Sequence, residues 1–289
     1  MTPNLRGAAL MTLAMALFAL EDMMIKIMAG DWPIGQIVLA LGIGGTPVFA
    51  VMAWRQGHSL WHRDLVSAPV ILRNVAELIG TFGFVTAIAL IPLSTASAIL
   101  QSAPLVVTVG AALFLGEQVG WRRWTAILIG LFGVLLIIRP GMQGFDPLAL
   151  WAVVGMLGLA ARDVIVRKVP ARVHTLQLAF LGFATLIPTG LLLLLAGGTP
   201  LRPAASDTAI YALIAIVLGV CAYYAILIAT RIGEVSFVTP FRYTRMVFAL
   251  IIGVLIFGER PDLLMLIGSA IVIASGIYTL WREGRHRNR

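Results

Sequence analysis

Residues 94–117 read STASAILQSAPLVVTVGAALFLGE, and residues 236–259 read SFVTPFRYTRMVFALIIGVLIFGE. The two blocks match in position at an offset of 142 residues (94 to 236), and both end in Gly-Glu. After a short gap, each block is followed by another apolar stretch that is rich in small residues. A long pattern that occurs twice in one chain predicts an internal repeat.

The sequence on both sides of these blocks is also strongly apolar. Hydrophobic residues make up 60% of the chain and charged residues only 12%, whereas a soluble domain carries about 25% charged residues. A helix needs roughly 20 apolar residues to cross a bilayer, and the alternating pattern of a membrane barrel is absent. The sequence therefore predicts an all-α integral membrane protein with ten transmembrane helices. The expected spans are residues 6–29, 35–54, 69–92, 94–115, 123–139, 147–168, 175–196, 209–230, 234–257 and 263–281.

The repeat divides these spans into two sets of five. We expect the first repeat to cover residues 1–141 and the second to cover residues 142–289. Because five is an odd number, the second repeat must enter the membrane upside down relative to the first. Inverted repeats are typical of transporters, which bind substrate near the midplane where the repeats meet.

The basic residues indicate how the chain is oriented. If the N-terminus is cytoplasmic, only Arg139, Arg202 and Arg260 lie in the loops of the opposite side, and the other basic residues outside the spans lie on the cytoplasmic side. This asymmetry predicts a multi-pass protein of a bacterial inner (plasma) membrane with both termini in the cytoplasm. The net charge of +8 is thereby explained by membrane topology, and no nucleic-acid partner is expected.

With these features, the chain resembles the drug/metabolite transporter superfamily, EamA type, over essentially its whole length. The resemblance rests on the two Gly-Glu blocks, the apolar helix after each block, and the count of five plus five helices. Residues 20–27, 121–141 and 240–262 also resemble a subgroup that contains S-adenosylmethionine uptake carriers. Riboflavin carriers and amino-acid exporters of the aromatic type belong to the same superfamily. The resemblance implies ten helices, inverted repeats, a central cavity and a small-molecule substrate.

Arg242 and Arg245 are the most deeply placed cations in the expected spans. They lie on the order of 12–17 Å along the ninth helix, one turn apart and hence on one face, just after Pro240. Charges at this depth are costly and normally face a cavity or a partner. One hypothesis is that they bind a substrate carboxylate, and the other is that they pair with acidic residues of neighbouring helices.

Glu21, Asp22 and Glu77 are the acidic counterparts at depth. They are candidates to bind a substrate ammonium group or a coupling proton, or to form ion pairs with the ninth helix. Asp22 could instead pair locally with Lys26, four residues away. Other charges are expected near the membrane interface: Arg73 by extending to the cytoplasm, and Arg162 and Asp163 by anchoring the sixth helix.

Uncharged residues could complete the cavity. Gln101 precedes Pro104, which is expected to kink the fourth helix, and Phe82, Tyr223 and Tyr243 could stack on a flat substrate or simply pack between helices. The candidate substrate-binding residues are Arg242, Arg245, Glu77, Glu21, Asp22, Gln101, Tyr243, Tyr223 and Phe82.

Other protein classes fit less well. All four histidines, His58, His62, His174 and His286, fall outside the expected spans, which argues against a buried protease site, and we expect neither an enzyme nor a metal or cofactor site. The chain has no phosphate-binding loop for ATP. We therefore predict a secondary transporter that exports amino acids, including aromatic ones, by alternating access. Uptake of S-adenosylmethionine, riboflavin or a similar metabolite is the alternative, and a channel is the second alternative.

Overall fold

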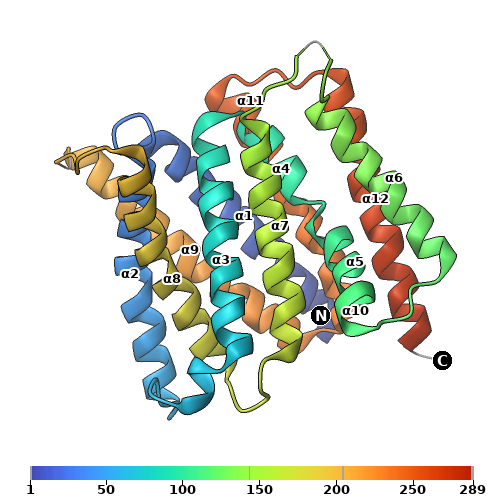
Figure 1. Ribbon diagram of the computed structural model, residues 1–289, viewed down its shortest axis with the longest axis horizontal. Helices are drawn as coiled ribbons and strands as arrows, with labels where there is room; N and C mark the ends of the chain where they lie inside the picture. Colours follow the sequence, from blue (N-terminus) through green and yellow to red (C-terminus); the bar gives the residue numbers. More distant parts are fainter. Residues whose placement is uncertain (1, 143, 204, 288–289) are drawn as a thin grey trace.

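The protein folds as a bundle of tilted helices (Figure 1). The computed structural model describes residues 2–142, 144–203 and 205–287, and it contains no strand within these ranges. Ten helical spans are long and apolar enough to cross a membrane, which confirms the expected multi-pass architecture. The first half contains α1 (Pro3–Met28), α2 (Ile34–Arg55), η1 (Arg63–Val66), α3 (Ala68–Leu90), α4 (Leu93–Leu100), α5 (Ala103–Leu115) and α6 (Trp121–Ile138). The second half contains α7 (Ala149–Ile165), η2 (Val166–Lys168), α8 (Thr175–Gly197), α9 (Ser206–Ile232), α10 (Val235–Val238), η3 (Thr239–Tyr243), α11 (Thr244–Phe257) and α12 (Leu263–Arg287).

The fourth and ninth spans are broken near their middle. The fourth divides into α4 and α5 at Gln101 and Ser102, just before Pro104, whose ring nitrogen has no hydrogen to donate. The ninth divides into α10, the 3-10 turn η3 and α11. We expected two continuous helices with a kink. The structure corrects this expectation, because each proline begins a new helical segment.

The two halves are inverted five-helix repeats that pack on each other. The most extensive interfaces are α2 with α8, α6 with α12, α1 with α9, and α3 with α7. In the repeat relation, α1 corresponds to α7 and α3 corresponds to α9, so the α1–α9 interface corresponds to the α3–α7 interface. The α2–α8 and α6–α12 interfaces each correspond to themselves. Two faces of the bundle are distinguished below. The terminal face carries the start of α1 and the end of α12, and the distal face carries the α6–α7 and α11–α12 connections (Figure 1).

Glycine allows α3 and α7 to approach closely. A Cβ atom added to Gly83 would lie 2.5 Å from the backbone nitrogen of Gly155 and 2.8 Å from the carbonyl oxygen of Trp151. Both neighbours are backbone atoms of a packed helix, so neither can move aside at low cost. Small residues at such crossings are how membrane helices achieve close contact.

Gly83→Ala is therefore expected to lower the free energy of unfolding by about 1–3 kcal/mol, the usual cost of overpacking. Thermal unfolding of the purified protein in detergent measures this loss. Gly120→Ala is the matched control, because a Cβ atom there meets nothing within 4 Å and its φ of −67° suits alanine. Equal melting temperatures for the two variants would contradict the close packing of α3 on α7.

Candidate functional site

The breaks in the fourth and ninth spans are joined by a hydrogen bond. The side-chain amide of Gln101 donates to the carbonyl oxygen of Arg242 over 2.8 Å. Gln101 is buried, and the carbonyl that it contacts lies in η3, at the break in the ninth span. Interrupted helices near the midplane are where transporters expose backbone and polar groups to their substrates. The candidate site is therefore built around these two breaks.

Four charged residues of α3 and α7 form a cluster beside the breaks, here called the α3–α7 cluster. Glu77 lies 2.7 Å from Arg73 Nη2 and 2.8 Å from Arg162 Nη1, so its carboxylate pairs with two guanidinium groups. Arg162 also pairs with Asp163 over 2.8 Å. The expectation that Arg73 extends to the cytoplasm is wrong, since its side chain is 3% exposed. Arg162 likewise lies in this cluster and does not anchor its helix at the membrane interface.

Asp163 is the more accessible member of its ion pair. Its side chain keeps 29% exposure, against 18% for Arg162, and it lies roughly 200° around α7 from the exposed Ala161. Asp163 is also within electrostatic range of Arg242, and Tyr223 of α9 is within range of the whole α3–α7 cluster.

A second group of charges joins α1 to α11. Asp22 accepts hydrogen bonds from Arg245 through both carboxylate oxygens, with two contacts of 2.8 Å. The guanidinium lies 5.0 Å from the ring centroid of Phe18 and 5.2 Å from that of Phe84, so cation–π attraction adds to the ion pair. The alternative of a local Asp22–Lys26 pair is wrong, since Lys26 donates to backbone carbonyls instead.

Two charges of this central region form no ion pair with the described residues. The Arg242 guanidinium forms neither a hydrogen bond nor an ion pair with any residue that the structure describes, and it is partly buried. The Glu21 carboxylate is likewise without an ion pair in the described ranges, and it packs against Gly219 of α9. The repeat offset of 142 relates Glu21 to Asp163, so the two repeats carry a carboxylate at this equivalent position.

The three aromatic candidates lie in different surroundings. The Tyr243 hydroxyl lies against Gly276 of α12 and has no hydrogen-bond partner among the residues that the structure describes. Phe82 packs on Trp151 with 5.6 Å between ring centroids. The Tyr223 ring contacts Phe49 and Phe183. Of these aromatic residues, Tyr223 is the one that the structure brings within range of the α3–α7 cluster.

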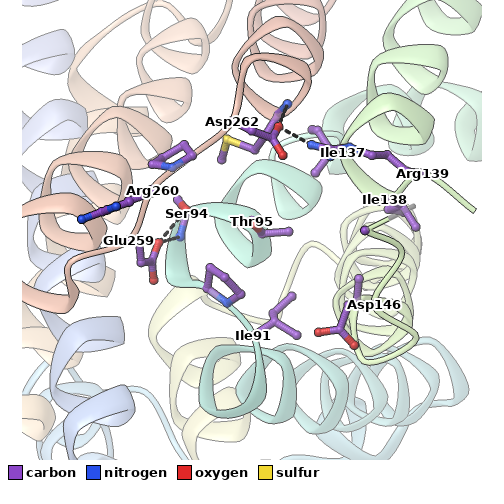
Figure 2. Close-up of a pocket in the computed structure, with 15 residues that line it drawn as sticks. Ile91, Ser94, Thr95, Ile137, Ile138, Arg139, Asp146, Glu259, Arg260 and Asp262 are labelled. Carbon is purple, nitrogen blue, oxygen red and sulfur yellow. Dashed lines mark hydrogen bonds and ion pairs between the residues drawn. The ribbon is translucent and has the colours of Figure 1, made fainter. Parts of the chain in front are cut away.

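A cavity of about 330 Å³ opens at the distal face (Figure 2). It lies over the start of α4, and Ser94, Arg139, Glu259 and Asp262 line it. Arg139 forms an ion pair with Asp262 that ties the end of α6 to the start of α12. This hydrogen bond holds the pKa of the Asp262 carboxyl below its usual range.

The bundle is closed beneath this cavity and less tightly packed at the terminal face. At the distal face, α4 packs on α11 and α1 contacts α3. The corresponding pairs at the terminal face are α5 with α10–η3 and α7 with α9. Neither shows comparable packing in the described part of the chain. The described helices thus pack more tightly at the distal face than at the terminal face.

Sequence reasoning missed Arg162 and Asp163 as members of the central cluster, and it gave Lys26 no role beyond a local ion pair. One signal could have found Asp163, because it occupies the position of Glu21 in the second repeat. The same offset relates Lys26 to Lys168.

Comparison with known proteins adds to this geometry. A family profile described as the EamA-like transporter family matches residues 5–139 and again residues 147–281. The chain is 25% identical to the S-adenosylmethionine uptake transporter of Rickettsia conorii, over 76% of this chain and 74% of that protein. It is 28% identical to the riboflavin transporter of Rhizobium johnstonii, over 76% and 72%. It is 27% identical to the pseudopaline exporter CntI of Pseudomonas aeruginosa, over 94% of both chains. A solved crystal structure shares the fold, with a TM-score of 0.61 and 21% identity over 96% of this chain and 97% of the other.

Proposed function

Because the chain belongs to the EamA-like transporter family and is thus a membrane transporter of small metabolites, we propose that its substrate is a zwitterion with an α-amino-acid group. One observation carries this proposal. Arg242 and Glu21 are two central charges that form no ion pair with the described residues. An unpaired charge at membrane depth is costly, and a ligand that brings one charge of each sign would pair both.

In this proposal Arg242 binds the substrate carboxylate, which a guanidinium can hold through two parallel hydrogen bonds. Glu21 binds the ammonium group. Asp163, its counterpart in the other repeat, lies near Arg242 and is the second acceptor available to a cation. Free amino acids have this head group, and so does S-adenosylmethionine. Riboflavin lacks it and should bind poorly.

Glu21 is also the proposed site of a coupling proton. A carboxylate that forms no ion pair with the described residues of the bundle interior is least costly when it is protonated. An arriving ammonium group would displace that proton, so binding of substrate and binding of proton would compete. Such competition couples substrate movement to a proton gradient.

We further propose that the terminal face is cytoplasmic and that residues 1–141 and 142–289 form the two repeats of an inner-membrane carrier. The excess of basic residues at the terminal face supports this orientation. Export is the proposed direction, and it is supported by the alignment with the exporter relative over 94% of both chains. Uptake is the alternative, in keeping with the name of the Rickettsia relative.

Counterflow in proteoliposomes tests the substrate. Vesicles containing the purified protein and unlabelled substrate are mixed with labelled amino acids, S-adenosylmethionine or riboflavin. We expect saturable exchange of a substrate with an α-amino-acid group and none of riboflavin. Exchange of riboflavin alone would refute the zwitterion proposal, and flux that neither saturates nor shows counterflow would indicate a channel. If S-adenosylmethionine exchanges and free amino acids do not, uptake becomes the favoured direction.

A further inference from the structure

The distal face is held closed by two charged side chains, here called the distal latch. Glu259 accepts hydrogen bonds from the backbone N–H groups of Leu93 (2.5 Å) and Ser94 (3.0 Å), and from the Ser94 hydroxyl (2.6 Å) (Figure 2). Lys26 donates to the carbonyl oxygens of Ile88 (3.1 Å) and Ile91 (2.5 Å). The latch thus ties the first and ninth spans to the connection between α3 and α4. Charge-assisted bonds of this kind are stronger than neutral ones.

The repeat offset of 142 maps both latch residues onto the terminal face. Glu259 corresponds to Glu117, and Lys26 corresponds to Lys168. The segment that the distal latch grips, residues 88–94, corresponds to residues 230–236 between α9 and α10. Both segments also have the same form, a helix end followed by a bend and a new helix.

The backbone around the two glutamates is matched as well. Gly116 and Gly258 precede them with φ values of 69° and 62°, a left-handed conformation that favours glycine. The N–H of Glu117 bonds to the carbonyl oxygen of Ala111 over 3.2 Å, and the N–H of Glu259 bonds to that of Gly253 over 2.9 Å. Each glutamate is therefore presented by the same turn at the end of a helix.

In the conformation described, the terminal residues are not engaged in this way. Glu117 pairs with Arg167, and Lys168 has no bonded partner in the described part of the chain. Arg167 corresponds to Ile25 in the first repeat, so the distal latch has no equivalent competitor. Arg167 therefore competes with residues 230–236 for Glu117.

We infer that Glu117 and Lys168 form a terminal latch that grips residues 230–236 when the terminal face closes, and that the two latches close in alternation. This inference rests on the proposed alternating-access function. Both latches act on the fourth and ninth spans, which are broken midway, so that their two ends can move separately. Loss of one latch should favour the conformation that the other latch closes.

Cysteine labelling at Ser97 tests the inference without any substrate. Ser97 lies one turn below the distal latch and is 0% exposed, so Ser97→Cys should react with a maleimide only when the distal face opens. Cys221, which is exposed, is first replaced by alanine. Lys26→Met is expected to raise the labelling rate about ten-fold, in keeping with the strength of hydrogen bonds to charged groups. Adding Lys168→Met or Glu117→Gln should return the rate to within about two-fold of the parent.

Arg172→Gln, which removes a basic residue of the terminal face outside the latch, is the matched control and should leave the raised rate unchanged. Gel filtration checks that each variant is folded, and Glu259→Gln replaces Lys26→Met if that variant is not. A rate that stays raised in both the Lys168→Met and Glu117→Gln combinations would overturn the terminal latch. Failure to exchange any substrate with an α-amino-acid group would refute the proposed substrate and leave the latch result intact.

Discussion

Arg242→Ala is expected to lower counterflow by at least 30-fold while the yield of folded protein stays near that of the parent. Removing one side of a desolvated charge pair costs about 2–5 kcal/mol, and here the partner is supplied by the substrate. Because Arg242 forms no ion pair with the described residues, its loss leaves no buried carboxylate uncompensated. Counterflow at several substrate concentrations, together with gel filtration, measures both effects.

Two further variants test whether Arg242 acts on transport through its guanidinium group. Arg242→Lys keeps the charge but loses the planar fork of the guanidinium, so transport should be weakened by less than in the alanine variant. Gln101→Glu would place a carboxylate beside the backbone of the ninth span and supply Arg242 with an internal partner, and it should also lower transport. Loss of folded protein in Arg242→Ala, with normal transport by the remaining folded molecules, would assign Arg242 to a structural role.

The sequence was sufficient to predict the membrane fold because its signals are local. Each span is a continuous apolar run, and the matching blocks that end at Glu117 and Glu259 relate the two halves. The breaks in the fourth and ninth spans were not predicted as breaks. A proline such as Pro240 indicates a disturbed helix, but whether the chain kinks or restarts depends on the neighbouring helices, which supply partners such as Gln101 for the freed carbonyl groups.

The site was predictable as a set of charges, and pairing of Asp22 with the ninth helix was one of the alternatives that the sequence left open. Asp22 lies four residues from Lys26 in sequence, yet it pairs with Arg245, which is distant in the chain. That choice depends on how α1 crosses the ninth span, and spacing within one helix carries no such information. Glu77 similarly selects both Arg73 and Arg162 because α3 and α7 meet at glycine contacts.

The remaining question about the site is whether Arg245 and Asp22 bind substrate or stabilise the fold. Arg245 lies between two aromatic rings and forms a bidentate pair with Asp22, whose side chain is 3% exposed. Both carboxylate oxygens of Asp22 and the Nε and Nη2 groups of Arg245 are thereby occupied. The geometry favours a structural role, and a substrate would have to break this pair to use either residue.

Asp22→Ala is accordingly expected to destabilise the protein by about 3–5 kcal/mol, because it leaves the Arg245 charge uncompensated inside the bundle. Arg245→Ala should have a similar effect, since it isolates Asp22. The double variant Asp22→Leu with Arg245→Met replaces the pair with apolar groups, a change that is often neutral or stabilising, so it should recover most of the lost melting temperature. If the double variant folds and still shows counterflow within a few-fold of the parent, the pair is structural. A double variant that folds well but carries nothing would instead place Asp22 or Arg245 in contact with the substrate, because a purely structural pair has no other route to affect transport once the fold is restored.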